Sequence, residues 1–181
     1  ASTGAVTSAG AINSGFIGIN GAGGVTVSGA IDAKSSINIG SNSGTTTIGA
    51  NVVTSAGSIG LSGRTGIKIT GGAQVSGPSN FSASTTDTAA SIDIDAGSSV
   101  TGQGAYLQAD NMEIQGTVSA GNGGIQIEVN SSGRTMDLGT NTAGQLALTQ
   151  TELNNLSTPT YLYLYNYGPT TVSAPITFSP T

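Results

Sequence analysis

The feature that most constrains this chain is a recurring step from small residues to a β-branched residue. Six anchor positions follow this step, with successive anchors 18 to 25 residues apart: Ile12, Ile31, Val52, Val75, Val100 and Val118. Most anchors are followed by two further apolar positions, often as alternating pairs such as "INI" (37–39) and "IKI" (67–69). Three short strands in each turn of about twenty residues are typical of a solenoid.

The alternation within these short segments has the period of a β-strand, in which successive side chains point to opposite faces. The charged residues test this interpretation. Five of them stand between two apolar neighbours and are therefore predicted to point away from the core: Lys68, Asp93, Glu113, Glu128 and Asp137.

Composition agrees with a narrow, coiled β-structure. The chain has 181 residues, of which 36% are hydrophobic, 4% are aromatic and 29 in number are glycine. Stacked turns would align Ile and Val inside a tube too narrow for many rings. Glycine-rich corners with positive φ are expected at 21–24, 40–44 and 121–124. A β-sandwich is the alternative, and it predicts hairpin turns and antiparallel pairing.

The charge and the missing residue types exclude several functions. Four Lys and Arg face nine Asp and Glu, and the basic residues form no cluster, so neither nucleic acid nor an anionic lipid surface is expected as a partner. The chain lacks cysteine and histidine, which removes thiolate and imidazole metal sites and the commonest general base. We predict no cofactor, no membrane insertion and no enzymatic activity.

Two segments, "GAIDAKSSINIG" (29–40) and "GTVSAGNGGIQIEV" (116–129), resemble the repeats of large secreted bacterial exoproteins of the filamentous haemagglutinin type. Residues 138–166 resemble a recurrent element of such exoproteins, in which a strand, a short helix and another strand interrupt the coil. The resemblance implies a right-handed parallel β-helix that forms the shaft of an adhesin exported by two-partner secretion. It also implies a secreted or cell-surface location, a longer parent chain, and a host-surface glycan or protein as partner. No Asn-Pro-Asn-Gly element of the family's secretion domain is found.

The C-terminal quarter departs from the coil pattern, so we predict coils over 1–140 and a bracing or capping segment over 141–181. Thr149 and Glu152 have the spacing of a capping box, which predicts a short helix over about 150–156. Leu153 and Leu156 would then share one face of this helix. In 79–91, polar residues interrupt the apolar spacing, and a protruding corner loop is expected there.

Two carboxylates are the only candidates for catalysis. Asp93 and Asp95 in "SIDIDAG" would lie on the same outer face of one strand, about 7 Å apart. Arg64 and Lys68, about one coil earlier, are placed to pair with them. Paired acids on a β-helix are compatible with a polysaccharide-binding or polysaccharide-degrading domain. A solvent-exposed charge ladder is the simpler interpretation and the one we favour.

Four tyrosines alternate in "YLYLYNY" (161–167): Tyr161, Tyr163, Tyr165 and Tyr167. If Leu162 and Leu164 point inward, the rings form a row on the outer face that could stack on sugars or on an apolar partner. The alternative is that the rings cover apolar surface beneath the helix or the following segment. We favour this second interpretation, with at least two rings partly exposed in either case.

Overall fold

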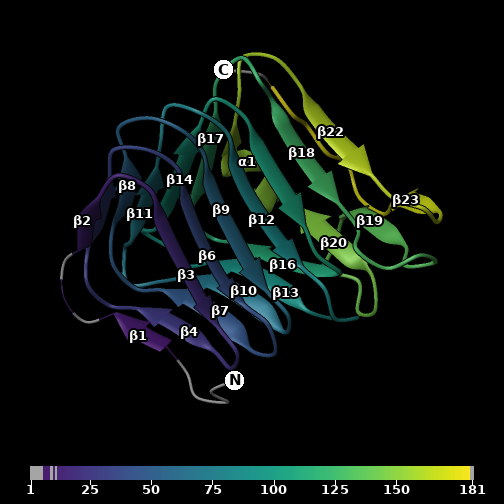
Figure 1. The fold of residues 1–181 in the computed structure, drawn as a ribbon. Helices are drawn as coiled ribbons and strands as arrows, with labels where there is room; N and C mark the ends of the chain where they lie inside the picture. The colour runs from purple at the N-terminus through teal and green to yellow at the C-terminus, as the bar shows by residue number, and fades with distance from the viewer. Residues whose placement is uncertain (1–5, 9, 11, 180–181) are drawn as a thin grey trace.

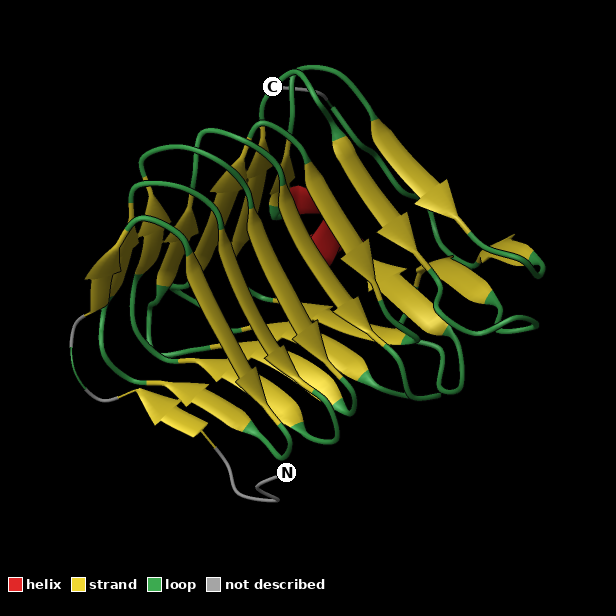
Figure 2. Cartoon of the chain, viewed as in Figure 1, coloured by secondary structure: helices red, strands yellow, loops and turns green. Residues whose placement is uncertain are grey.

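The chain folds into a parallel β-solenoid, as shown by a computed structural model that describes residues 6–8, 10 and 12–179. Successive coils stack along one axis, and their strands run in the same direction in each wall (Figure 1). Three walls surround the core, and the short helix lies near the C-terminal end of the stack (Figure 2). The predicted all-β parallel β-helix is therefore confirmed, and the sandwich alternative is wrong because every strand pair in this part of the chain is parallel.

Sheets A and B form two of the walls. Sheet A contains, in spatial order, β1 (Val6–Ser8), β4 (Val25–Val27), β7 (Thr45–Ile48), β10 (Gly66–Ile69), β13 (Ser91–Ile94) and β16 (Asn111–Ile114). Sheet B contains β2 (Ile12–Ser14), β5 (Ile31–Ala33), β8 (Val52–Thr54), β11 (Gln74–Ser76), β14 (Ser99–Gly102), β17 (Thr117–Ala120) and β21 (Leu156–Ser157).

Sheet C forms the third wall, and a small sheet D follows at the C-terminal end. Sheet C contains β3 (Ile17–Gly21), β6 (Ile37–Ser41), β9 (Ile59–Gly63), β12 (Phe81–Thr85), β15 (Ala105–Gln108), β18 (Ile125–Glu128) and β22 (Leu162–Tyr165). Sheet D has the order β20 (Leu146–Thr149), β19 (Met136–Gly139) and β23 (Thr170–Val172). Within residues 141–181, β21 and β22 continue sheets B and C.

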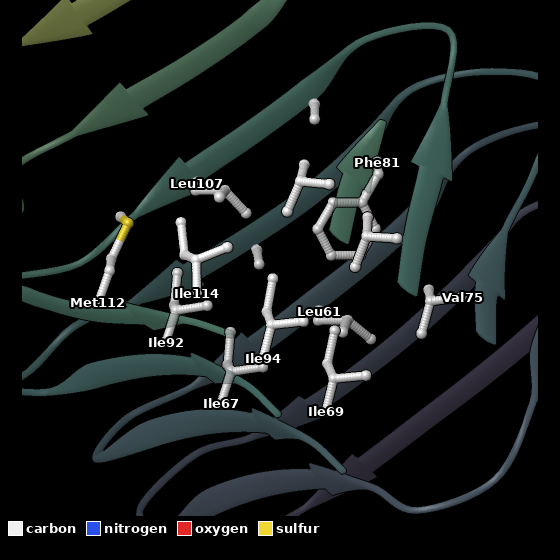
Figure 3. Close-up of a cluster of buried hydrophobic side chains, with 14 of the residues drawn as sticks. Leu61, Ile67, Ile69, Val75, Phe81, Ile92, Ile94, Leu107, Met112 and Ile114 are labelled. Atoms are coloured by element: carbon white, nitrogen blue, oxygen red, sulfur yellow. The ribbon is translucent and has the colours of Figure 1, made fainter. Parts of the chain in front are cut away.

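The core consists of in-register ladders of aliphatic side chains. The six predicted anchors are the inward positions of sheet B, where each is paired with the anchor of the next coil. In sheet A, Ile67, Ile92 and Met112 follow one another in register and are buried, as Figure 3 shows. Each strand thus buries the same face as its neighbours, which explains why Ile and Val recur at nearly fixed intervals.

Glycines permit the tight corners for two different reasons. Gly124 has a φ of +71°, the left-handed conformation that was predicted for the corner at 121–124. Gly44, in the corner at 40–44, does not have positive φ but lies against the coil below. A Cβ atom at Gly44 would be 2.8 Å from the backbone nitrogen of Gly24. The stacking distance, rather than the dihedral angle, selects glycine at that corner.

The corner loop predicted over 79–91 is wrong for its central part. Phe81–Thr85 is strand β12, paired on both sides within sheet C, and Phe81, Ala83 and Thr85 are buried. The residues of this range that lie outside the strands are 79–80 and 86–90. The prediction failed because small polar residues alternate with Phe81 and Ala83, and one alanine gives a weak apolar signal. The buried Thr85 satisfies its hydroxyl by donating to the carbonyl of Gln108 at 3.4 Å.

The predicted short helix is confirmed as α1 (Gln150–Asn154), with Thr149 and Glu152 forming the capping box. The Glu152 side chain also accepts a hydrogen bond from the backbone N–H of Ile114 at 3.3 Å, which ties the helix to sheet A. The helix is shorter than predicted, because Leu156 begins β21 and pairs with Val118 in sheet B. Leu153 and Leu156 are both buried, but they belong to different elements.

Asp137 is the one predicted outward charge that is buried. It points away from the apolar positions of β19, but the C-terminal segment covers it. Its Oδ2 atom accepts hydrogen bonds from the hydroxyls of Thr140 and Ser173, each at 2.9 Å, and from Thr142. The hydroxyls of Thr142 and Ser173 lower the pKa of Asp137, against the opposing effect of burial. The alternation therefore predicted the outward direction of the Asp137 side chain correctly, but the C-terminal segment covers this side chain and buries it.

Candidate functional site

The two carboxylates of the predicted acidic pair, Asp93 and Asp95, lie in different local surroundings. Asp93 lies on the outer face of β13, where Lys68 of the preceding coil forms an ion pair with it at 3.3 Å. Asp95 follows the end of β13 and belongs to a turn, in which its carbonyl accepts from the backbone N–H of Ser98 at 3.0 Å. The pairing of Lys68 with Asp93 is therefore confirmed.

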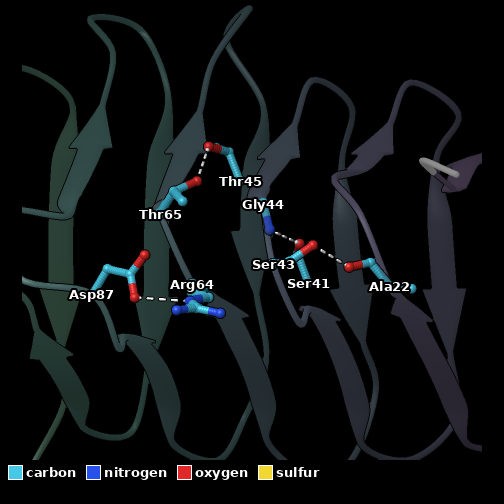
Figure 4. Close-up of polar contacts among 8 residues, drawn as sticks. All are labelled: Ala22, Ser41, Ser43, Gly44, Thr45, Arg64, Thr65 and Asp87. Carbon is cyan, nitrogen blue, oxygen red and sulfur yellow. Dashed lines mark hydrogen bonds and ion pairs between the residues drawn. The ribbon is translucent and has the colours of Figure 1, made fainter. Parts of the chain in front are cut away.

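Arg64 pairs with neither Asp93 nor Asp95, contrary to the prediction. Its Nε atom donates to Oδ1 of Asp87 at 2.8 Å, between neighbouring coils (Figure 4). Asp87 lies in the short segment after β12, so this ion pair holds the end of that segment against the coil below. Nearby, Thr45 and Thr65 share a hydroxyl hydrogen bond of 3.0 Å across the same corner (Figure 4). These contacts are a structural ladder along one edge of the solenoid.

The residue beside Asp93 in register is Glu113 of β16, one coil further on. Both line a surface hollow of about 570 Å³, which Glu152 of α1 also lines. The sequence pointed to Asp95 as the partner of Asp93 because the two share one strand. The stacked register instead brings a carboxylate from the next coil beside it.

The tyrosine row lies on the outer face of the last coil. Leu162 and Leu164 pack against the core, and Tyr161, Tyr163 and Tyr167 are 54%, 49% and 60% exposed. The rings of Tyr163 and Tyr165 are stacked at a centroid distance of 6.2 Å. The Tyr167 ring meets that of Tyr165 edge-on at 5.0 Å. The prediction that at least two rings are exposed is therefore confirmed, whereas the choice between a sealing and a binding role stays a prediction.

The outer face of sheet C continues from these tyrosines across all of its seven strands. Its central row is in register from coil to coil: Gly18, Asn38, Gly60, Ser82, Tyr106, Gln126 and Tyr163. Two hollows of about 410 and 380 Å³ lie along this face and share Ser82. We call this surface the sheet C trough.

One carboxylate lies at the edge of the trough, and its oxygens are occupied. Glu128 accepts hydrogen bonds from the Tyr106 hydroxyl at 2.8 Å and from the amides of Gln108 and Gln126, each at 3.3 Å. Partial burial, followed by this hydrogen bond and the charge of Glu128, raises the pKa of Tyr106. Tyr106 therefore remains a protonated donor, and the floor of the trough is formed by amides, hydroxyls and glycine.

Within 6–8, 10 and 12–179, no three Asp, Glu, Cys or His side chains are grouped to hold a metal ion. In the same part of the chain no helix is long and apolar enough to cross a membrane, since α1 has five residues.

The fold and its outer surfaces define a parallel β-solenoid with an uncharged trough on one wall. Comparison with protein-family models, curated proteins and solved structures finds no match for this chain.

Proposed function

We propose that this chain is a shaft and adhesive module of a secreted or cell-surface bacterial adhesin. The observation that carries the proposal is the continuous register of sheets B and C, each of which contains seven strands. A stack in which every coil is hydrogen-bonded to the next is stiff along its axis, as a shaft must be. The resemblance of 29–40 and 116–129 to filamentous haemagglutinin repeats supports the same role, together with a longer parent chain and two-partner secretion.

The surface composition also supports an adhesive role. The described chain contains two ion pairs, Arg64 with Asp87 and Lys68 with Asp93, and its exposed faces are mostly Ser, Thr, Asn and Gly. A low-charge surface does not select partners by long-range electrostatic attraction. Contact with a host-surface glycan or protein would instead depend on hydrogen bonds and exposed rings.

Attachment of protein-coated beads to cultured epithelial cells tests this function. Beads that carry the purified chain should attach more often than beads that carry the Ile92→Asp variant. That variant places an unpaired charge in the core and should not fold. Equal attachment of the two bead populations would contradict the proposed adhesive role.

A polysaccharide-degrading role is the second candidate, and the hollow lined by Asp93, Glu113 and Glu152 favours it. Retaining glycosidases place two carboxyl groups about 5–5.5 Å apart, which is close to the distance between neighbouring strands. The ion pair with Lys68 counts against this role, because it occupies Asp93. Release of reducing ends from soluble polysaccharides, abolished by Glu113→Gln, would establish it.

A further inference from the structure

The sheet C trough has the dimensions of a site for an extended ligand. Its central row runs from Gly18 on β3 to Tyr163 on β22 and crosses six strand spacings. At about 4.8 Å per spacing, the row is about 29 Å long. The two hollows along it share Ser82, so the depression continues from one to the other. A ligand that follows this row would contact several coils at once.

The chemistry of the floor selects an uncharged, hydroxyl-rich ligand. Asn38, Ser82 and Gln126 offer both donors and acceptors, and they carry no charge. The single carboxylate beside them, Glu128, already accepts three hydrogen bonds. With no Lys or Arg in the rows that line the trough, sulfate, phosphate and uronate groups would have no counter-charge.

Exposed aromatic rings lie at both ends of the trough. The Phe16 ring lies over the outward side of Gly18, 3.2 Å from the position that a Cβ atom would take, and is 59% exposed. At the other end, the Tyr161 ring lies 2.7 Å from the corresponding position of Gly124. Glycine at these two places lets each ring lie close to the backbone. Aromatic faces beside a polar floor suit sugar rings, which present apolar C–H faces and polar edges.

We propose that the sheet C trough binds a neutral glycan chain lying along the solenoid axis. The floor hydrogen-bonds the sugar hydroxyls, and Phe16 and Tyr161 stack on sugar rings at the two ends. This inference rests on the proposed adhesive function and names the class of ligand that serves it. The proposed site exists only in the folded solenoid, because the central row of the trough forms only when the coils are stacked in register.

Calorimetric titration of the full chain tests this assignment, with cellohexaose, xylohexaose and laminarihexaose as neutral probes. A heparin-derived hexasaccharide and hexagalacturonate serve as acidic probes of similar length. We expect at least one neutral hexasaccharide to bind with a millimolar or lower dissociation constant, and both acidic ones to bind at least about tenfold more weakly. Failure of all three neutral probes, or preference for an acidic one, would overturn the proposal.

Two variants locate the binding. Gly60→Gln fills the middle of the trough, where the new Cβ would lie 2.6 Å from the movable Oδ1 of Asn38 and 3.6 Å from the Ser82 hydroxyl. Thr101→Gln adds the same side chain at an exposed position on sheet B. Gly60→Gln should lower affinity at least about tenfold without changing the melting temperature, and Thr101→Gln should change neither.

Tyr161→Ser provides a second perturbation if Gly60→Gln folds poorly, and it should also weaken binding. Unchanged affinity in both trough variants would overturn the location of the site. The bead assay separates this inference from the proposed function. Attachment to cells without binding of any neutral glycan would overturn the glycan assignment and leave the adhesive role standing, whereas loss of attachment by Gly60→Gln beads would support both.

Discussion

Replacement of Ile92 by alanine should destabilise the solenoid far more than replacement of its neighbour Asp93. Ile92 is completely buried, and Ile67 and Met112 flank it in the core ladder. Truncation of a buried isoleucine costs about 2–5 kcal/mol, since backbone hydrogen bonds to both adjacent coils prevent the cavity from collapsing. Asp93→Ala removes one ion pair with an exposed lysine, which is worth less than about 1 kcal/mol.

The difference can be measured by urea unfolding followed by circular dichroism. For a chain of this size, a loss of about 3 kcal/mol lowers the melting temperature by about 6–12 °C. Ile92→Ala should shift the urea midpoint with little change in slope, while Asp93→Ala should unfold close to the unmodified protein. Equal midpoints for the two variants, or a larger effect for Asp93→Ala, would show that the inward and outward faces of β13 have been exchanged.

Three further changes test other parts of the structure. Ala89 has a φ of 65°, so Ala89→Gly should relieve strain and raise the stability by about 0.5 kcal/mol in calorimetry, and a lower melting temperature would count against this conformation. Gly116→Ala should cost about 1–3 kcal/mol in urea unfolding, because its Cβ would lie 2.4 Å from the carbonyl oxygen of Ser98, and an unchanged midpoint would contradict that close approach. Burial opposes ionisation of Asp110, but hydrogen bonds from Ser131 and from a backbone N–H outweigh it and lower the pKa of Asp110. Its stabilising contribution should therefore be complete above the unfolded value of about 3.9 and be lost as pH falls through the lower folded pKa. Melting temperatures measured from pH 7 to 2 should fall less steeply below pH 4 in Asp110→Asn, and parallel curves would refute this role.

The coil architecture could be predicted because short local sequence patterns indicate it. Ile31, Val52 and Val75 each follow a small-residue step, and the alternation around Lys68 and Asp93 identifies their inward and outward faces. Strand β12 was missed because Ala83 and Thr85 are poor markers of a buried face. Their burial depends on β9 and β15 pairing on either side.

The outer surface was harder to predict, because it depends on the register between coils. Asn38, Ser82 and Gln126 each stand between two inward residues of a strand, a signal that alignment of the coils on their apolar positions could have shown. The partner of Asp93 was assigned within one strand as Asp95, whereas stacking supplies Glu113. Asp137 is enclosed by Ser173, 36 residues later in the chain, as well as by the nearby Thr140 and Thr142, and no local pattern contains the contribution of Ser173.

Parallel stacking in one register creates both the core and the sheet C trough, and cysteine cross-linking tests it most directly. The chain has no native cysteine, so any disulfide within one molecule must join the two introduced residues. Thr101 and Ser119 are register partners on sheet B, while Thr117 lies two residues away from Ser119 on the same strand. Neighbouring strands about 4.8 Å apart suit a disulfide, whereas the diagonal pair is about 8 Å apart and does not. The structure predicts rapid disulfide formation under mild oxidation in Thr101→Cys/Ser119→Cys and almost none in Thr101→Cys/Thr117→Cys; the opposite result, or equal oxidation of the two variants, would contradict the register.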